Sequence, residues 1–253
     1  MPRRRRKNKA LAWLAAFIIV TVFLFGGWFG YQWLLYRKAK FTRYPEFGIA
    51  IPNEYSIHGI DVSKYQSIIA WEEVKAMQVS NIHLAFAFIK ATEGIDNTDP
   101  LFHRNWRKAK ANSITRGAYH FFIASKDGKM QAENFIKRVD LDAGDLPPVL
   151  DVEQRNGCSI EQIKKEVRKW LETVENYYGV VPIIYTNVDF YNSCLGTEFD
   201  KYPLWVAHYY QQQQPSIKRD WLFWQHNDQG NVNGICTEAL VTLRVILPSY
   251  LKK

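Results

Sequence analysis

The pattern of hydrophobic and polar positions is most distinctive near the start of the chain. Residues 10–36 contain no charged side chain and are rich in Leu, Ile, Val, Phe and Trp. At a helical rise of about 1.5 Å per residue, this run can cross a hydrocarbon core about 30 Å thick. The pattern therefore predicts one N-terminal transmembrane helix, with residues 10–36 in contact with the lipid bilayer.

A cleaved signal peptide is the alternative interpretation, because the basic cluster Arg3–Lys7 also resembles the start of such a peptide. The apolar run is long for a signal peptide, however, and no small-x-small cleavage motif follows it. We therefore favour an uncleaved signal anchor. The positive-inside rule then makes residues 1–9 a basic cytoplasmic tail of a single-pass protein of the cell (inner) membrane. The rest of the chain is expected on the extracytoplasmic, periplasmic side.

Beyond residue 56, extended and helical patterns alternate along the chain. Runs of apolar and aromatic residues predict strands at 57–61, 83–90, 116–122, 148–153, 181–186, 204–208, 222–225 and 241–246. Helical patterns occur at 71–77, 100–111, 130–139 and 159–178, and the last of these opens with a capping-box spacing. Residues 37–56 show no clear periodicity and are expected to form a juxtamembrane stalk.

This alternation indicates an α/β fold. Strands that alternate with helices form a parallel sheet, and eight strands in one domain imply a barrel. The connections after the fifth strand are too short or too irregular for full helices. We therefore expect a modified TIM-like barrel over residues 57–253, in which five β/α units are followed by three strands with few helices.

Composition changes this picture in two respects. The net charge of +8 comes from the ten basic residues of the first 43, so residues 44–253 carry a net charge of −2. A basic surface for nucleic acid is therefore not expected on the folded part. The cysteines Cys158, Cys194 and Cys236 allow at most one disulfide, and Cys158–Cys194 is favoured if any forms. They show no zinc-ligand spacing, so no metal is expected.

The strongest candidate for chemistry is the end of the run 146–153, where Asp151 and Glu153 are separated by one residue. Side chains alternate across a strand, so both acids point to the same side. Two neighbouring carboxylates resist joint ionisation, which can keep one protonated near neutral pH. A protonated acid beside a charged one is what cleavage of a glycosidic bond requires. The alternative is a pair of acids that only cap the next helix.

Other polar and aromatic residues lie at the predicted carboxyl ends of strands, where barrels gather their functional groups. Asp61 ends the first strand and completes a set of three acids. Aromatic faces stack on sugar rings while acids and amides bind hydroxyls, so this mixture suits a carbohydrate. The candidate substrate-binding residues are Lys90, Glu93, Tyr119, His120, Phe122, Tyr185, Asn187, Trp205, Trp224 and Gln225.

Seven motifs in order resemble those of glycoside hydrolase family 25, the lysozymes of the Chalaropsis and cellosyl type. The motifs are residues 59–66, 88–94, 117–122, 147–153, 182–187, 204–209 and 223–225. The resemblance implies hydrolysis of the β-1,4 bond between N-acetylmuramic acid and N-acetylglucosamine in peptidoglycan glycan strands, with no metal or organic cofactor. It also implies the same barrel that the alternation of strands and helices predicts.

The resemblance also implies roles for the three acids. Glu153 matches the family's proton donor, and Asp61 and Asp151 match its strand-end aspartates. The substrate's own acetamido group is then the internal nucleophile, one of the exceptions to the two-carboxylate scheme. Asp151 would stabilise the oxazolinium, and Asp61 would hold the sugar or tune the acids. The cleft would be formed by Tyr119, Phe122, Tyr185, Trp205 and Trp224.

The resemblance departs from the family at the last strand. The family commonly has Val-Asp-x-Asn there, whereas this chain has Val241-Thr242-Leu243-Arg244. Because all three acids are present, an active enzyme is still the favoured interpretation. A catalytically impaired peptidoglycan-binding protein is the first alternative. A chitinase-like barrel glycosidase is the second, although its longer run of acids is represented upstream only by Asp145.

Overall fold

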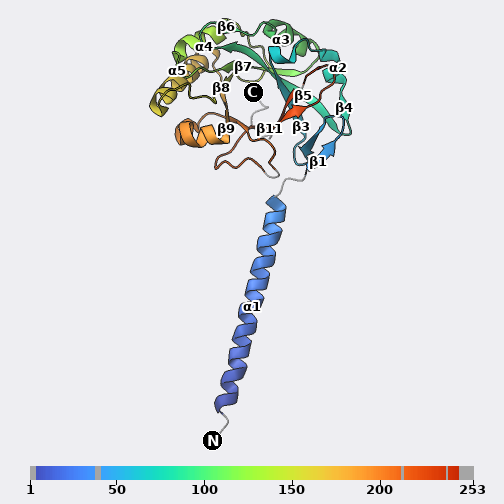
Figure 1. Ribbon diagram of the computed structural model, residues 1–253, viewed down its shortest axis with the longest axis vertical. Helices are drawn as coiled ribbons and strands as arrows, with labels where there is room; N and C mark the ends of the chain where they lie inside the picture. The colour runs from blue at the N-terminus through green and yellow to red at the C-terminus, as the bar shows by residue number, and fades with distance from the viewer. Residues whose placement is uncertain (1–3, 38–40, 212–213, 238, 245–253) are drawn as a thin grey trace. The chain divides into compact units, whose positions relative to one another are not determined.

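The computed structural model describes residues 4–37, 41–211, 214–237 and 239–244, with side chains for 11–34, 41–211 and 214–237. The chain divides into an N-terminal unit built on helix α1 (Arg4–Arg37) and a body that begins at Phe41 (Figure 1). Within α1, Leu11–Leu34 has a mean hydropathy of 2.2 and is long and apolar enough to cross a membrane. The hydroxyl of Thr21 donates a hydrogen bond to the carbonyl of Phe17, so its polar group is satisfied inside the helix.

The body is built on a curled sheet whose two ends meet. The main strands are β3 (Ile57–Val62), β5 (Ile82–Glu93), β7 (Thr115–Phe121), β8 (Val149–Asp151), β9 (Ile183–Asn187), β10 (Leu204–Ala207), β11 (Phe223–Gly230) and β12 (Ala239–Arg244). They follow one another around the sheet, and β3 pairs with both β5 and β12. Only β12 runs antiparallel to its main-strand neighbours. Two short strands, β4 (Gln78–Val79) and β6 (Asn97–Thr98), pair with β5.

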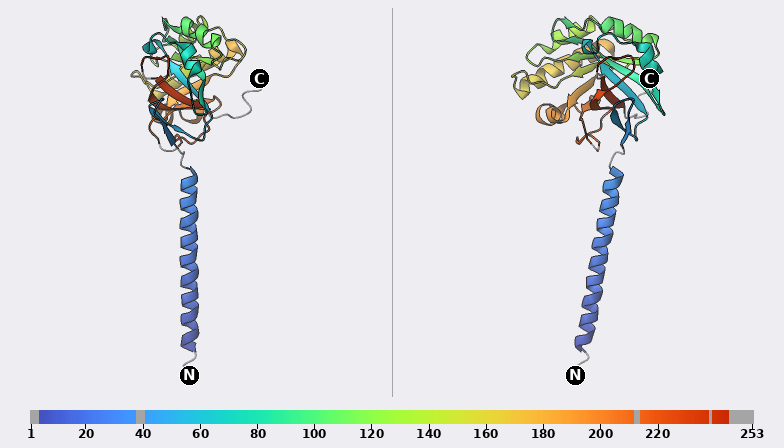
Figure 2. Two further views of the ribbon diagram at one scale, coloured as in Figure 1. Left: turned by 90° about the vertical axis from the view of Figure 1, so that its right-hand side faces the viewer. Right: turned by 45° about the vertical axis from the view of Figure 1, so that its right-hand side comes forward.

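Helices lie around the outside of this sheet (Figure 2). The four predicted helices are confirmed: α2 (Trp71–Ala76), α3 (Phe102–Ala111), α4 (Gly128–Ile136) and α5 (Ile160–Tyr178). Short helical segments follow β9, namely α6 (Val188–Phe190), η2 (Tyr191–Leu195) and η3 (Gly196–Phe199). In the described residues after β10, no further helix is found. The predicted order of five β/α units and three strands is therefore observed.

Side-chain alternation divides the core of the body into two parts. One apolar cluster lies inside the curled sheet, and a larger one lies between the sheet and the elements outside it. Phe88 belongs to the inner cluster and stacks on Trp205, with ring centroids 4.4 Å apart. Gly117 makes room for Phe88, because a Cβ at this position would lie 2.5 Å from its ring. Large inner side chains therefore fill the interior below the functional rim.

The segment before β3 differs from the sequence prediction. Residues 37–56 were expected to form an irregular stalk, but β1 (Phe41–Tyr44) and β2 (Ile49–Pro52) form an antiparallel hairpin. Ile49 and Ile51 are buried in the outer core, and Phe41 contacts Trp224 edge to face. The hairpin therefore belongs to the body, which begins at residue 41 rather than 57. The alternation of Ile49 and Ile51 is a strand signal, but it is too short to stand out in the sequence.

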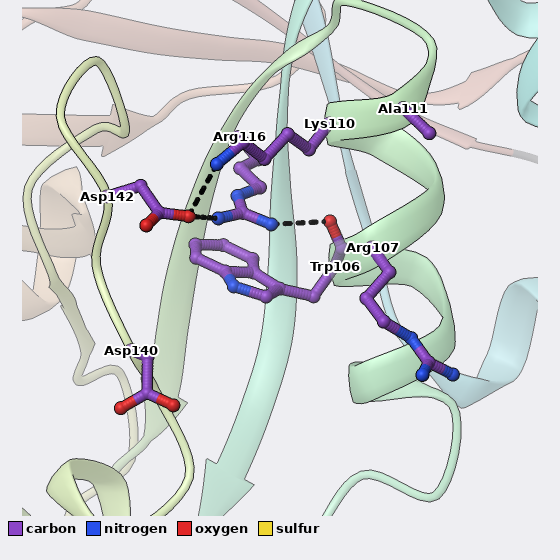
Figure 3. A pocket seen from close by; sticks show the side chains of 7 residues that line it. All are labelled: Trp106, Arg107, Lys110, Ala111, Arg116, Asp140 and Asp142. Atoms are coloured by element: carbon purple, nitrogen blue, oxygen red, sulfur yellow. Dashed lines mark hydrogen bonds and ion pairs between the residues drawn. The ribbon is translucent and has the colours of Figure 1, made fainter.

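An arginine network stabilises the body near the amino end of β7 (Figure 3). The Arg116 side chain donates to both oxygens of Asp145, to Asp142 and to the backbone carbonyl of Trp106. Its guanidinium also lies 3.9 Å from the centroid of the Trp106 ring. Four of the five N–H groups of its guanidinium are thus paired while the side chain is only 4% exposed. Such pairing is the condition for burying a charge at low cost. This network joins α3, β7 and the loop before β8.

All three cysteines are free thiols in this fold. Cys194 is buried, Cys158 is partly buried and Cys236 is exposed. No disulfide forms among them, so the condition for the predicted Cys158–Cys194 pairing is not met in this structure. Cys194 lies in the outer core as a small apolar side chain, which is the common role of a buried cysteine.

Candidate active site

A pocket of about 240 Å³ opens at the carboxyl ends of the strands. Side chains from the ends of β3, β5, β7, β8, β9 and β10 contribute to its wall, as expected for a barrel-like sheet. The lining residues are Asp61, Val62, Ser63, Tyr65, Gln66, Lys90, Tyr119, Phe121, Asp151, Glu153, Tyr185, Trp205 and Tyr209. The pocket therefore gathers residues from six strands that are far apart in the sequence.

The three predicted acids meet in this pocket. Asp61 comes from β3, Asp151 is the last residue of β8, and Glu153 follows two positions later. Asp61 and Asp151 are buried, with 3% and 7% of their surface exposed, whereas Glu153 is partly exposed. Val152, between the two acids of β8, is buried in the outer core. The alternation expected of a strand thus continues past β8 and directs both acids inward.

The environment of Asp151 and Glu153 favours a shared proton. Burial, together with the nearby charge of Glu153, raises the pKa of Asp151 well above its usual value, and Lys90 opposes that rise. Burial also raises the pKa of Glu153. Two adjacent carboxyls in such a site titrate as a pair, so one proton is retained at higher pH than by a free acid. A pair of this kind can donate a proton and hold a negative charge at the same time.

Two buried polar atoms in the pocket have no protein partner among the described residues. They are Oδ1 of Asp151 and the indole Nε1 of Trp205. Buried polar atoms are normally hydrogen-bonded, so an acceptor and a donor left open in one pocket indicate places where a ligand or water binds. Both residues line the pocket.

Asp61 is held by a hydrogen-bond network behind the pocket wall. The side-chain amide of Gln225 donates from Nε2 to Oδ2 of Asp61 at 2.8 Å. Its Oε1 accepts from the hydroxyl of Tyr185 at 2.7 Å and from the hydroxyl of Tyr209. Gln225 is 1% exposed and is not among the lining residues of the pocket. It was predicted to bind substrate, and the structure instead places it behind residues that line the pocket.

The turn after β3 supplies three lining residues that the sequence prediction missed, Ser63, Tyr65 and Gln66. Ser63 and Gln66 form a capping box around η1 (Lys64–Gln66). The carboxylate of Asp99 accepts from the backbone nitrogen of Lys64 at 2.7 Å and so fixes this turn from outside. The Ser63-x-x-Gln66 spacing is a capping signal that could have identified the turn from sequence.

Lys90 lies at the pocket wall, paired with Glu93 at 2.6 Å and 4.7 Å from the ring centroid of Phe121. Glu93 itself does not line the pocket. The aromatic part of the wall includes Tyr119 and Tyr185, and the ring of Tyr185 lies 4.5 Å from that of Trp205. Burial raises the pKa of both tyrosines well above the usual value, so both hydroxyls stay protonated and can donate hydrogen bonds.

Four further predicted binding residues lie outside the pocket. His120 is fully buried on the outer side, between Thr92 and Gln131. Phe122 belongs to the outer core, and the residue that lines the pocket is Phe121. The physical reason is alternation, because Tyr119 and Phe121 share one face of β7 while residues 120 and 122 point the other way.

The remaining two, Asn187 and Trp224, form hydrogen bonds to backbone atoms outside the pocket. The side chain of Asn187 caps α6 by accepting from the backbone nitrogen of Phe190 at 2.8 Å. Trp224 is fully buried in the outer core, and its indole donates to the carbonyl of His208 at 2.9 Å. The predicted site residues that line the pocket are therefore Asp61, Lys90, Tyr119, Asp151, Glu153, Tyr185 and Trp205.

The sequence of this chain is similar to one protein family and to several known proteins. The model of Glycosyl hydrolases family 25 matches residues 60–235. The chain is 48% identical to the uncharacterized protein YegX of Escherichia coli K12 over 200 residues, which cover 79% of this chain and 72% of that protein. It is 34% identical to Lysozyme M1 of Streptomyces globisporus over 194 residues, which cover 71% of this chain and 64% of that protein.

Solved structures show the same relationship. A family 25 glycosyl hydrolase from Bacillus anthracis superimposes with a TM-score of 0.72 at 30% identity. The superposition covers 83% of this chain and 97% of that structure. The matched region in this comparison therefore includes most of the body and nearly the whole of the solved enzyme.

Proposed function

The chain belongs to glycosyl hydrolases family 25 and is a glycoside hydrolase of the lysozyme and muramidase type, and from this premise we propose that it is a membrane-anchored peptidoglycan hydrolase. The bond cleaved is the β-1,4 linkage between N-acetylmuramic acid and N-acetylglucosamine. The observation that supports this proposal most directly is the pair Asp151 and Glu153 in a strand-end pocket, with both pKa values raised.

In the proposed reaction, Glu153 is the general acid and base. The carbonyl oxygen of the substrate's acetamido group attacks the anomeric carbon while the glycosidic bond breaks, and Glu153 gives its proton to the leaving oxygen. Asp151 stabilises the positive charge on the oxazolinium. Water, deprotonated by Glu153, then opens this ring at the anomeric carbon. Asp61 holds the sugar or contributes to the field around the two acids.

The test of this mechanism is the substitution Glu153→Gln. It keeps the shape of the side chain but removes the transferable proton, so release of reducing ends from purified sacculi should fall by about two orders of magnitude or more. Glu161→Gln is the matched control, because Glu161 is exposed at the start of α5. That variant should keep wild-type turnover.

Two results would contradict the mechanism. Near wild-type turnover in Glu153→Gln would mean that another residue protonates the leaving oxygen. If the unaltered protein binds sacculi and releases no reducing ends, the chain is a binding protein with an impaired site. Mass spectrometry of the released muropeptides identifies which bond is cut.

The anchoring proposal places Leu11–Leu34 across the membrane, with the N-terminus in the cytoplasm and the body outside. A reporter that is active only outside the cytoplasm, fused after Lys253, should be active, and the mature chain should retain its first 36 residues. The same reporter fused at the N-terminus is the control and should be inactive. A mature N-terminus between residues 26 and 44 would show a cleaved signal peptide in place of the anchor.

A further inference from the structure

The network behind the pocket wall contains an amide with two different ends. Oε1 of Gln225 receives two hydroxyl donors, from Tyr185 and Tyr209, and Nε2 is directed at Asp61. Amide oxygen accepts and amide nitrogen donates, so the two ends are not interchangeable. Both tyrosine hydroxyls remain protonated because burial raises their pKa values. The tyrosines therefore fix which end of Gln225 faces the acid.

This orientation has a consequence for the proton on Asp61. A carboxylate accepts the N–H of Gln225, and a hydrogen bond to the charged form of an acid favours that form. Rotation of the amide by half a turn would direct Oε1 at Oδ2 of Asp61. Two oxygens at hydrogen-bond distance need a proton between them, so this arrangement is compatible only with a protonated Asp61. The orientation of the amide and the charge of Asp61 are thus coupled.

We propose that Gln225 is a positioning residue that holds Asp61 ionised, so that the proton of the acid cluster stays on the pair of Asp151 and Glu153. This inference rests on the proposed hydrolase function, since it assigns each acid a protonation state for that reaction. Gln225 acts through Asp61 and does not line the pocket. Without its N–H, Asp61 competes for the proton that Glu153 donates.

The experiment measures the titration of Asp61 directly. The full chain, labelled with ¹³C at aspartate carboxyls and held in detergent micelles, is titrated by NMR, and the Asp61 signal is assigned with Asp61→Asn. In Gln225→Met the midpoint for Asp61 should rise by about one pH unit or more. In Gln225→Glu it should rise further, because a second carboxylate lies against Asp61 while both tyrosines keep an acceptor.

Activity gives a second readout. The acid limb of the kcat/KM profile on solubilised peptidoglycan should move to higher pH by a similar amount in both variants, because the proposal assigns the ionised form of Asp61 to the active enzyme. Gln229→Glu is the matched control, since it makes the same chemical change on the same strand at an exposed position. Its Asp61 midpoint and its acid limb should equal those of the unaltered protein.

The outcomes separate this inference from the proposed function. Equal Asp61 midpoints in the unaltered protein and Gln225→Met would overturn the role of Gln225, as would equal acid limbs in an active enzyme. If Gln225→Met does not fold, the same comparison with Gln225→Glu decides. A shifted Asp61 midpoint in a protein that releases no reducing ends would support the control of Asp61 by Gln225 and refute the hydrolase proposal.

Discussion

At the scale of single residues, the last strand departs from the family pattern at two positions, Thr242 and Arg244. The register of β12 places Thr242 opposite Gly59 of β3 on one side and Gln225 of β11 on the other. It is therefore a neighbour, within the sheet, of the amide that binds Asp61. The side chain of Thr242 lies outside the described residues, so its effect on the acids stays a prediction.

Thr242→Asp should move the alkaline limb of the pH–rate profile to higher pH. An added anion disfavours ionisation of Glu153, so its pKa rises and the protonated acid persists at higher pH. A shift of a few tenths to about one pH unit is expected for a partly screened charge. The measurement compares profiles on solubilised peptidoglycan, with Thr242→Asn as the uncharged control. Superimposable alkaline limbs would mean that position 242 is too distant or too screened.

The residue scale also shows where prediction from sequence succeeded and failed. Asp61, Asp151 and Glu153 were predicted as a group because acids at the ends of apolar strands are rare and costly, and all three line one pocket. Phe122 was predicted in place of Phe121 because the two residues are chemically identical in the sequence. They differ only in the face of the sheet to which each side chain points: Phe121 lines the pocket and Phe122 lies in the outer core. Gln225 was assigned to the substrate because a sequence does not show that three side chains lie around it.

At the scale of elements, the β1–β2 hairpin covers part of the outer side of the sheet, as the helices do elsewhere. Ile49 and Ile51 lie in the outer core with Ile60 of β3 and Trp224 of β11. His58 precedes Ile60 by two residues on β3, and His226 follows Trp224 by two residues on β11. Both histidines are buried. With hairpin residues such as Thr42 and Tyr44, His58 lines a cavity of about 300 Å³. The hairpin thus covers part of the outer side of the sheet, where β2 contacts β11.

These buried histidines make the fold sensitive to acid. Burial lowers the pKa of His58 to about 4 and that of His226 to about 3, whereas a histidine of the unfolded chain has a pKa near 6.5. Between these values the unfolded chain binds protons that the folded body does not, so stability falls as pH falls below about 6.5. The loss for each histidine is about 3 kcal/mol by pH 4.

The measurement is urea unfolding at pH 7 and at pH 4.5. His226→Gln should lose less stability on acidification than the unaltered chain, because it removes one of the buried groups that must be protonated. His103→Gln is the control, since His103 is exposed in α3 and should leave the dependence unchanged. An equal loss in His226→Gln and the unaltered chain would show that this histidine does not govern acid stability.

At the scale of the whole molecule, the alternation of strands and helices was enough to predict the order of the main elements. The strands after β9 were placed correctly from short aromatic runs such as Leu204–Ala207. The antiparallel direction of β12 was not predicted, because the predicted strands 222–225 and 241–246 leave a connection long enough for a crossover between parallel strands. In the structure β11 extends to Gly230 and β12 begins at Ala239, so the connection is too short for such a crossover. The hairpin was missed because it has few apolar residues, and these pack against Trp224 of β11, which is distant in the sequence.

The closure of the sheet has a consequence for the order in which the body folds. During synthesis the chain emerges from its N-terminal end, so β1, β2 and β3 precede β11 and β12 by more than 150 residues. The hairpin and one edge of β3 must remain uncovered until those last strands arrive. Contacts between such distant segments form slowly and expose apolar surface meanwhile. A chain that ends before β11 would therefore be a ready substrate for proteases and chaperones of the compartment in which it folds.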